Sequence, residues 1–571
     1  MAPIPDARLT CVSNAPVSTY SGMLPGVLAG QYPRERMELD LVRLCAAAGA
    51  RLILGDVTGL DVIGRELLFE DRPPLPFDVL SIGIGSVPST EGLEIGGEDI
   101  LTIKPMPTFL DRLELRLRVV SRRVTGRPLR LAMVGGGAGG VEIALCLAPF
   151  LKRTLGDLPS GITLIQSGER LAAGVHPRTN DLVQRRLVNR GISVHLGRRV
   201  RRVHTGFITL CDGGQIEADI VIWSTRAAAP SVLGTLGLPV DERGFLLTRP
   251  TLQVDAEAPI FVVGDSGTIA GSATSKAGVF AVRQGPVLWR NIARHLEGRT
   301  LDTYRPQIAF LKLLNTGDRR AIGECRGLSF EGRWCRRLKD FIDGRFMDKY
   351  QDYTMMPEGR TRPSTSPTGM RCTGCGGKIG GATLSRVLQR LDRSDGAGVI
   401  VGLDAPDDAA IVRPPDGQRL ALTVDFFAAP LEDAFLVGRI AALHAASDAF
   451  AMNAMPLWAM AMTTVPYGAP RAQERLLFES LSGSLREFGR VGVSLVGGHT
   501  IEGPQFTVGF SVVATAAPGP LRIKGGFRKE DRLVLTKPIG TGILLAAHAR
   551  ALCKAAWMEG LLGRVDKSQG V

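Results

Sequence analysis

Apolar positions in the first 350 residues alternate between short strand-like runs and helix-like periodic segments. One such unit is "RPLRLAMVGGGAGGVEIALCLAPFL", in which a strand-like run passes directly into a helical pattern. The next strand is predicted in "GITLIQSGERL", and residues 194–230 alternate like a hairpin that ends in a buried strand. A further apolar strand, in residues 258–269, ends at Gly264-Asp265. Strands that alternate with helices predict a doubly wound α/β fold.

The pattern changes after a stretch rich in Pro, Gly, Ser and Thr at residues 355–371, which has no apolar periodicity and is typical of a linker. Beyond it, strand-like runs alternate with Ala-rich helices, as in an α+β domain. The most apolar segment, residues 449–465, is interrupted by Asn453 and Pro456 and is too short to span a bilayer. We interpret it as a buried helix followed by a strand. The predicted organisation is a first domain over 1–350, a linker over 351–370, and two further parts over 371–530 and 531–571.

Composition and charge narrow the class of protein. The chain has 571 residues, of which 44% are hydrophobic and 22% charged, which predicts several soluble globular domains. A formal charge of +13 favours anionic partners such as nucleotides. No basic block is interleaved with aromatic residues, so we expect no nucleic acid, and we do not predict peripheral membrane contact. The N-terminus lacks a signal or transit pattern and nine cysteines are scattered, so we expect a cytoplasmic protein.

Gly135, Gly137 and Gly140 form a G-x-G-x-x-G motif between the predicted strand and helix. Glycines allow the tight turn and the close approach of a pyrophosphate, whose charge then lies at the helix N-terminus. The acid that usually binds the adenine ribose is absent at the end of the next strand, where Gln166 stands. The motif therefore predicts NAD(P)H binding and leaves the choice between NADH and NADPH open.

The stretch "RCTGCGGKIG" at residues 371–380 holds Cys372, Cys375 and Lys378 among flexible glycines. It could be half of a zinc site, a redox pair, a phosphate loop, or a nucleophile on a mobile arm. Zinc needs four ligands, but the next cysteine is Cys553 and no histidine lies between His295 and His444. A redox pair would favour a strand-to-helix setting rather than a position after a linker. The simplest alternative is a solvated loop with a free thiol.

Carboxylates recur at predicted element ends in the second half of the chain. We predict Asp407 and Asp408 in a turn, Asp425 at the end of a strand, and Asp448 on a helix. Oxygen ligands of this kind suit Mg²⁺, although a single aspartate at a strand end is usually only a turn or cap residue. We also predict a turn at Gly497, Gly498 and His499 after an apolar strand, where the backbone could approach a nucleotide closely.

The first block, over residues 8–300, resembles the FAD-dependent pyridine nucleotide oxidoreductases, especially the type II NADH dehydrogenase branch. The resemblance implies FAD and NAD(P)H as cofactors and assigns Asp265 to the ribityl chain of the flavin. Two features depart from the family. The first Gly-rich loop, which cradles the FAD phosphates, is absent, and Cys11 and Cys45 are too far apart in the sequence to predict a close redox pair.

The second block closely resembles selenophosphate synthetase (selenide, water dikinase), whose PurM/AIR-synthetase-like ATP-binding domain is shared with aminoimidazole ribonucleotide synthetase. The resemblance makes Cys375 the selenium-carrying nucleophile and Lys378 an essential lysine on a mobile arm, and His444 replaces a frequent Asn. It implies the conversion of ATP, selenide and water to selenophosphate, phosphate and AMP, by a homodimer. The resemblance also implies that Asp408 and Asp448 bind Mg²⁺. It assigns contacts with ATP to Lys378, Asp407, Asp425, Asp448, Gly497, Gly498 and His499.

We expect that both ends of the chain are truncated, because a second synthetase domain with a further Mg²⁺-binding aspartate does not follow. Three hypotheses result. The chain is a bifunctional enzyme whose flavin module supplies electrons or reduced selenium to the synthetase; or it is a non-catalytic nucleotide-binding partner; or only the oxidoreductase works, as an NADH dehydrogenase-like flavoprotein.

Overall fold

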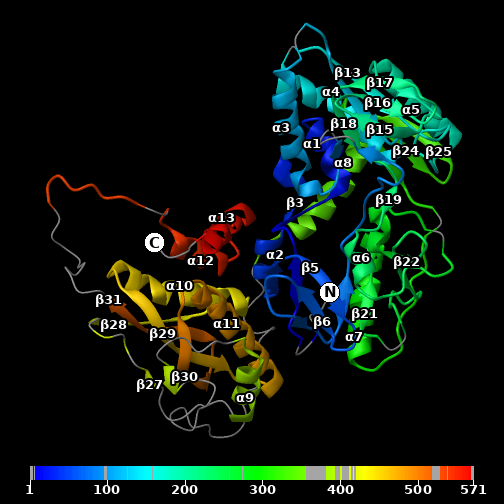
Figure 1. Cartoon of the computed structure of the whole chain (residues 1–571). Coiled ribbons are helices and arrows are strands. Elements are labelled where there is room, and N and C mark those ends of the chain that lie inside the picture. Colours follow the sequence, from blue (N-terminus) through cyan, green and yellow to red (C-terminus); the bar gives the residue numbers. More distant parts are fainter. Residues whose placement is uncertain are drawn as a thin grey trace.

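The computed structural model of the chain shows two modules in contact (Figure 1). We call the elements from β1 to α8 the N-terminal module and those from α9 to β31 the C-terminal module; two further helices, α12 and α13, follow. The described residues are 4, 7–95, 100–124, 126–156, 158–255, 258–272, 274–307, 309–354, 381–392, 399–401, 411–412, 414, 416, 419–516, 528–535 and 538–567.

A five-stranded parallel sheet forms the upper lobe of the N-terminal module in Figure 1. Its order is β11-β18-β12-β13-β14, so the chain turns to opposite sides of β12, and the carboxyl ends of the strands there form the crevice in which such sheets bind ligands. Five of the six residues of β12 and all four residues of β18 are buried, as expected for a parallel sheet covered on both faces. The strands are β11 (Ile100–Thr102), β12 (Leu129–Val134), β13 (Ser160–Ile165), β14 (Ser193–His195) and β18 (Ile220–Trp223).

Helices cover one face of this sheet and a small antiparallel sheet covers the other. The helical face packs Leu131, Met133 and Ile222 against the helices, whereas Val134 and Trp223 pack against the antiparallel strands. The helices are α3 (Phe109–Ser121), α4 (Ala138–Leu155) and α5 (Pro177–Asn189), and the second sheet contains β10 (Glu94–Ile95), β15 (Val200–His204), β16 (Gly206–Leu210) and β17 (Gln215–Ala218).

The lower lobe of the N-terminal module contains two separate parallel strand pairs that share one apolar cluster. β1 pairs with β4, and β8 pairs with β21; Ile53, Ile82 and Ile260 pack together between them. The bounds are β1 (Thr10–Ser13), α2 (Leu41–Ala48), β4 (Arg51–Leu54), β5 (Val57–Asp61), β6 (Glu66–Phe69), β7 (Leu75–Pro76), β8 (Leu80–Ile82), α6 (Val232–Thr235), β20 (Leu246–Thr248), β21 (Ile260–Val262), β22 (Gly267–Ile269) and α7 (Gly278–Leu296). Shorter elements are β2 (Val17–Thr19), α1 (Leu24–Leu28), β3 (Glu38–Asp40), β9 (Val87–Pro88) and β19 (Ala227–Ala228).

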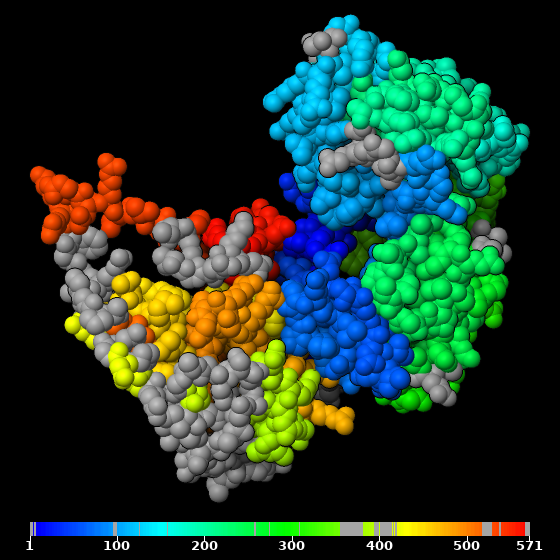
Figure 2. Space-filling view, viewed as in Figure 1, coloured from blue at the N-terminus to red at the C-terminus, as the bar shows by residue number. Residues whose placement is uncertain are grey.

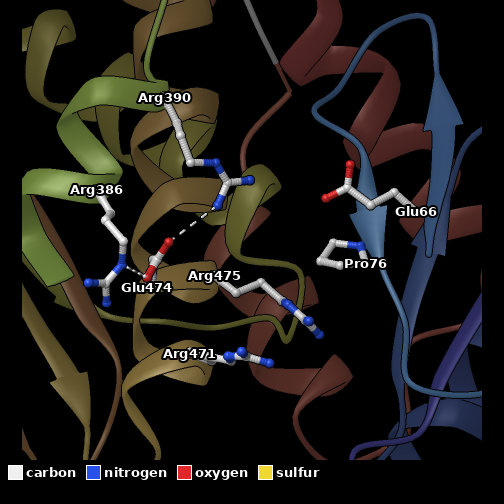
Figure 3. A pocket seen from close by; sticks show the side chains of 7 residues that line it. All are labelled: Glu66, Pro76, Arg386, Arg390, Arg471, Glu474 and Arg475. Atoms are coloured by element: carbon white, nitrogen blue, oxygen red, sulfur yellow. Dashed lines mark hydrogen bonds and ion pairs between the residues drawn. The ribbon is translucent and has the colours of Figure 1, made fainter. Parts of the chain in front are cut away.

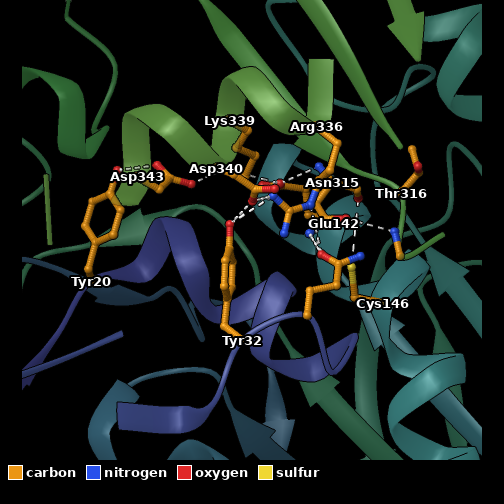
Figure 4. Close-up of polar contacts among 12 residues, drawn as sticks. Tyr20, Tyr32, Glu142, Cys146, Asn315, Thr316, Arg336, Lys339, Asp340 and Asp343 are labelled. Carbon is orange, nitrogen blue, oxygen red and sulfur yellow. Dashed lines mark hydrogen bonds and ion pairs between the residues drawn. The ribbon is translucent and has the colours of Figure 1, made fainter. Parts of the chain in front are cut away.

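The N-terminal module ends in a hairpin and the long helix α8 (Arg333–Tyr350), which follows β23 (Lys312–Asn315), β24 (Ala321–Cys325) and β25 (Leu328–Gly332). A buried charge network holds α8 in place (Figure 4). The ammonium of Lys339 lies 3.2 Å from Asp343 and 4.0 Å from Glu142 on α4, and Tyr20 donates a hydrogen bond to Asp343 at 3.1 Å. Burial lowers the pKa of Lys339, but the two carboxylates outweigh it and the pKa is raised overall. The helix is therefore fixed by paired charges.

The C-terminal module is a four-stranded sheet with order β28-β31-β29-β30 and two long helices on one face. The helices approach so closely that a Cβ on Gly438 would lie 1.9 Å from the carbonyl oxygen of Ser480, and one on Gly483 would lie 1.9 Å from that of Phe435. The elements are α9 (Gly381–Arg390), β26 (Val399–Val401), β27 (Ile411–Val412), β28 (Arg419–Ala428), α10 (Ala434–Ala451), β29 (Met455–Pro466), α11 (Pro470–Arg490), β30 (Ser494–Gly503) and β31 (Thr507–Ala516).

The apolar segment at residues 449–465 forms the end of α10 and the strand β29, as predicted. In the described part of the chain, α10 alone has the length and composition to cross a membrane, but 56% of its window is buried. It packs against α11 and the sheet as a core helix.

The opposite face of this sheet is open. On β28, Leu422 is 73% exposed and Val424 60%, with Leu420 and Phe426 also exposed, and Met460 of β29 adds to the same exposed set. Contiguous exposed apolar surface of this kind usually marks an interaction site.

The modules meet through buried ion pairs, and Figure 2 shows the blue surface of the N-terminal module touching the orange surface of the C-terminal module. Arg72 donates two hydrogen bonds to Asp433, at 2.8 and 3.0 Å, and Arg51 donates two to Glu479, at 2.8 and 3.2 Å. All four side chains are at most 8% exposed. Asp433 also caps the N-terminus of α10 by accepting from the amide of Phe435. The N-terminal module therefore holds the start of α10.

Two C-terminal helices, α12 (Thr541–His548) and α13 (Ala555–Lys567), pack against α2. Val42 of α2 lies in one apolar cluster with Cys553 and Met558. The carboxylate of Asp40 accepts a hydrogen bond from the amide of Ala555 at 2.8 Å, and Arg43 donates to the carbonyl of Ala551 at 2.9 Å.

Candidate functional site

The glycine motif lies between β12 and α4, as predicted, and two of its glycines are sterically required. Gly135 has φ +112°, and a Cβ there would lie 2.1 Å from the carbonyl oxygen of Ser224. A Cβ on Gly140 would lie 1.9 Å from the carbonyl oxygen of Gly135. Gly137 differs, because nothing lies within 4 Å of its Cβ position. This glycine faces the open space that a ligand could occupy.

The N-terminus of α4 is free to bind an anion. Gly137 is the N-cap residue, no side chain caps the helix, and no acidic residue occurs in its first turn. The first amide groups of a helix have no partner within the helix, and they carry the positive end of its dipole. A pyrophosphate at this position would accept hydrogen bonds from these amide groups and would lie at the positive end of the dipole. The residues at the start of α4 therefore fit a dinucleotide.

Gln166, at the end of β13, does not extend toward a ribose position. Its side-chain oxygen accepts a hydrogen bond from the amide of Gly136 at 2.9 Å. Its main chain is held by His195 and Arg198 on either side. Gln166 therefore braces the glycine turn from the strand end where related sites often place an acid.

Asp265 follows β21 in a single 3-10 turn, Gly264–Ser266. Its carboxylate accepts a hydrogen bond from the hydroxyl of Ser86 at 2.8 Å and lies 3.8 Å from the ammonium of Lys104. Burial lowers the pKa of Lys104, and the charge of Asp265 opposes this shift. A flavin hydroxyl at Asp265 would therefore share the carboxylate with Ser86.

Lys276 was not identified from the sequence, because no motif surrounds it. Its ammonium donates hydrogen bonds to the carbonyl of Gly267 at 2.6 Å and the hydroxyl of Thr268 at 3.0 Å, and it lies 3.8 Å from the ring centre of Phe245. Burial lowers its pKa to about 8, against the attraction of nearby carboxylates. A lysine that titrates near neutral pH is a candidate proton donor.

Thr423, Asp425, His444 and Asp448 form one cluster in the C-terminal module, where α10 crosses β28. The hydroxyl of Thr423 donates a hydrogen bond to Asp448 at 2.8 Å, and the imidazole of His444 lies 3.7 Å from Asp425. Thr423 and Asp425 alternate on one face of the strand, and His444 and Asp448 are one helical turn apart. The prediction that β28 ends at Asp425 was wrong, because the strand continues to Ala428.

Gly497, Gly498 and His499 do not form a turn. They lie inside β30, paired with Met460, Ala461 and Met462 of β29. A Cβ on Gly498 would lie 2.3 Å from the carbonyl oxygen of Ala461, so this glycine is required by the close approach of β29. The predicted turn was wrong because strand pairing overrides the local preference of a Gly-Gly pair.

The structure does not bring these glycines to the carboxylate cluster within one chain. β28 and β30 are opposite edges of the sheet, separated by β31 and β29. Three strand spacings correspond to about 14 Å. Asp425 and Asp448 therefore lie at one edge, and Gly497, Gly498 and His499 at the other.

Four predicted site residues, Cys375, Lys378, Asp407 and Asp408, lie outside the described residues. Within the described ranges, no group of three or more His, Cys, Asp or Glu side chains has a metal-binding arrangement. The Asp448 carboxylate is exposed, and carboxylate oxygens are the ligands that Mg²⁺ prefers. Its side chain is therefore chemically suited to Mg²⁺.

A pocket of about 460 Å³ lies between the modules (Figure 3). Glu474 lies 2.7 Å from Arg386 and 3.6 Å from Arg390, while Arg475 points toward Pro76 (Figure 3). Four arginines against two glutamates favour an anion over a cation. The lining residues are Glu66, Pro76, Arg386, Arg390, Arg471, Glu474 and Arg475.

Cys11 and Cys45, for which we expected no close redox pair, are both free thiols. Cys11 lies on β1 and Cys45 on α2, and the neighbouring Cys45 lowers the pKa of Cys11 to about 7. The residues are distant in sequence, but the chain returns from α2 into β4, the parallel neighbour of β1. The separation of the two cysteines in the sequence does not reveal that the fold places β1 and α2 close together.

Two family models match separate parts of the chain. Residues 6–288 match the pyridine nucleotide-disulphide oxidoreductases, and residues 406–516 match the N-terminal domain of AIR synthase related proteins. The predicted combination of these two domains in one chain is confirmed, and so is the fold class of each.

Relatives of the second part are named selenide, water dikinase. The protein from Desulfitobacterium hafniense (strain Y51) is 36% identical over 198 residues, which are 34% of this chain and 57% of that protein. The protein from Nitratidesulfovibrio vulgaris (strain DSM 19637 / Miyazaki F) is 38% identical over 190 residues, 33% of this chain and 52% of that protein. The chain spans about half the length of the curated relatives it matches.

Solved structures resemble the N-terminal module in fold. The sulfide:quinone oxidoreductase of Aquifex aeolicus has a TM-score of 0.52 at 17% identity, covering 62% of this chain and 88% of that one. NDH2 from Plasmodium falciparum in complex with NADH has a TM-score of 0.51 at 15% identity, covering 61% and 95%. At these identities the similarity establishes the fold alone.

Proposed function

We propose that the C-terminal module binds ATP with Mg²⁺ and takes part in the selenide, water dikinase reaction, in which ATP, selenide and water give selenophosphate, phosphate and AMP. The observation that carries this proposal is the cluster of Asp425, Asp448, Thr423 and His444 at the crossing of β28 and α10. The similarity to proteins named selenide, water dikinase supports it.

The chemistry explains why carboxylates are needed. An anionic nucleophile and a polyphosphate repel each other, and Mg²⁺ held by Asp448 together with Asp408 would neutralise part of that charge. In this proposal Asp407, Asp425 and Lys378 contact ATP. Cys375 supplies a thiolate at the selenium site, and the positive charge of Lys378 favours that thiolate form.

We propose further that the working unit is a homodimer. The open face of the sheet exposes Leu422, Val424 and Phe426, which a second copy would cover. Gly497 and His499 lie on the opposite edge of the sheet from Asp425, so a second chain could contribute one of these two sets of residues to the site.

For the N-terminal module we propose an FAD-dependent NAD(P)H oxidoreductase. The unobstructed Gly137 and the uncapped start of α4 support NAD(P)H binding, and Asp265 is the residue that would bind a flavin. A bound flavin would supply hydride acceptance. We propose a cytoplasmic location, which is supported by seven free thiols within the described residues.

The decisive experiment measures AMP formation by the full chain with ATP, Mg²⁺ and selenide. Selenide-dependent AMP formation is expected, with loss of at least about a hundredfold in Asp448→Asn and Cys375→Ser. Asp531→Asn is the matched control, because Asp531 is exposed and its carboxylate accepts a hydrogen bond from the backbone amide of Arg528. ATP binding without any turnover would instead identify a non-catalytic nucleotide-binding partner and overturn the dikinase proposal.

The oxidoreductase proposal has its own test. The purified chain should show flavin absorbance that NAD(P)H bleaches, and Asp265→Ala should lower the flavin content. A colourless protein that does not bind added FAD would contradict this part of the proposal and leave the dikinase part intact. Bleaching by NADH without AMP formation would favour a protein that works only as an NADH dehydrogenase-like flavoprotein.

A further inference from the structure

The pocket between the modules is built from both halves of the chain (Figure 3). Glu66 and Pro76 are paired across β6 and β7, and they form the wall that belongs to the N-terminal module. The opposite wall comes from α9 and from the first two turns of α11. The volume of about 460 Å³ is within the range of small-molecule sites in proteins. The pocket is therefore large enough for a ligand of low molecular mass.

Glu474 holds two of the four arginines of the pocket. Its carboxylate accepts a hydrogen bond from Arg386 at 2.7 Å and lies 3.6 Å from Arg390. The guanidinium of Arg390 also lies 4.1 Å from the ring centre of Phe478. Only 14% of the Glu474 side chain is exposed, so this carboxylate is itself held within the fold. Both arginines of α9 are therefore positioned before any ligand binds.

Arg471 and Arg475 differ from the arginines of α9, because neither guanidinium makes a hydrogen bond or an ion pair with the part of the chain that the structure describes. The two residues are one helical turn apart on α11, so their like charges repel each other. The first turn of this helix contains no acidic residue, and the positive end of the helix dipole lies there. A bound anion would relieve this concentration of positive charge.

We propose that the pocket binds a small phosphate anion with two or more negative charges, such as pyrophosphate. The four arginine charges and the two glutamate charges of the lining leave a net charge of +2. A guanidinium donates parallel hydrogen bonds to phosphate oxygens, which makes arginine well suited to this ligand. The anion accepts hydrogen bonds from Arg471 and Arg475, while Arg386 and Arg390 remain shared with Glu474 and add their charge.

Glu66 makes the affinity depend on both modules. Its side chain extends from β6 toward the opposite wall (Figure 3), so its negative charge opposes an anion between the modules. A phosphate bound only to the outer surface of α11 would not be sensitive to this charge. The pocket shares no residue with the glycine turn or with the cluster of Asp425 and Asp448, so the proposal is independent of the proposed function.

The test modifies the arginines of the full chain with phenylglyoxal in the absence of Mg²⁺ and maps the modified residues by peptide mass spectrometry. Pyrophosphate should slow the modification of Arg471 and Arg475. Arg122, which is exposed at the end of α3, should react equally with and without pyrophosphate. The reference sample contains sodium chloride at the same ionic strength, because salt alone screens exposed charges.

The pyrophosphate concentration that gives half-maximal protection of Arg475 measures the affinity of this pocket alone. Arg471→Gln should raise that concentration by about tenfold or more, as expected for the loss of a charge-assisted hydrogen bond. Arg122→Gln is the matched control and should leave it unchanged. Glu66→Gln should lower it severalfold, because the variant removes the opposing charge, and tighter binding cannot result from misfolding.

Three results would overturn the proposal. If sodium chloride protects Arg471 and Arg475 as well as pyrophosphate does, these arginines respond only to ionic strength. If pyrophosphate protects neither residue, the pocket is a solvent-filled junction without a ligand. If protection is unaffected by Glu66→Gln, the anion lies on the outer surface of α11 and not between the modules.

Discussion

The glycine turn of the N-terminal module and the carboxylate cluster of the C-terminal module differ in how completely one chain builds them. At the turn, Gly135 and Gly140 are packed against backbone atoms and Gln166 braces the loop. In the cluster, Asp425 instead lies on the edge strand β28, whose other side chains form the exposed apolar face, and Asp448 lies on α10. Residues that are close in the sequence form the whole of a turn between a strand and a helix. A site on a sheet edge is open to solvent, so residues of a second chain can contribute to it.

Substitution of the glycines tests how tightly the turn is built and has the largest expected effect. Gly140→Ala should lower the free energy of unfolding of the N-terminal module by about 3 kcal/mol or more, because its Cβ would collide with the carbonyl of Gly135. Gly137→Ala should leave the stability unchanged and weaken NAD(P)H binding, since its Cβ points into open space. Thermal melting and nucleotide titration measure the two effects. Equal melting temperatures for the two variants would contradict the comparison.

The open sheet face is tested by a charge on β28. Leu422→Asp should weaken self-association by about a hundredfold or more, equivalent to about 2.7 kcal/mol, because a dimer would bury an unpaired carboxylate. Sedimentation or light scattering over a concentration series measures this change. Leu533→Asp is the matched control, since Leu533 is 84% exposed and lies outside the sheet. If Leu422→Asp associates as strongly as the unaltered chain, the proposal of a homodimer that covers this sheet face is contradicted.

The hydroxyl of Thr423 tests the internal order of the carboxylate cluster. Thr423→Val removes the donor to Asp448 while keeping the shape of the side chain. ATP should bind about threefold to tenfold more weakly, in line with about 1 kcal/mol for one hydrogen bond. Calorimetric titration with Mg²⁺ and ATP measures this loss, with the far-UV circular dichroism spectrum as a check on folding. Full affinity would show that Thr423 does not position Asp448.

The smallest expected effect concerns the titration of Cys11. Alkylation of Cys11 should reach half its maximal rate near pH 7, because Cys45 lowers its pKa to about 7, and Cys45→Ala should move this midpoint upward. The folded pKa lies below the unfolded one, so this thiolate stabilises the fold above about pH 8.5, and the contribution is lost as pH falls through 7. Peptide mapping after brief iodoacetamide treatment measures the rate, and the urea-unfolded chain provides the reference. A midpoint near 8.5 in the folded chain would contradict the contact.

Features that depend on neighbours in the sequence were predictable. The strand, turn and helix at Gly135–Gly140 follow from an apolar run, three glycines and a periodic helix, all within one short segment. The helix that carries Asp448 was predicted for the same reason. The steric demand for a glycine and the periodicity of a helix depend on neighbouring residues, so both can be predicted from the sequence alone.

Features that depend on pairing between distant segments were decided only by the tertiary structure. The Gly497-Gly498 pair indicated a turn, but pairing with β29 extends the strand through it. Cys11 and Cys45 lie on neighbouring elements because α2 returns the chain to β4, the partner of β1, and Arg72 of the N-terminal module pairs with Asp433. The sequence by itself determined the local elements on which the candidate residues lie, such as the turn at Gly135–Gly140 and the helix that carries Asp448. Which of them lie together, and which lie on opposite edges of a sheet, was decided by strand order and module packing, because these arise from contacts between residues that are far apart along the chain.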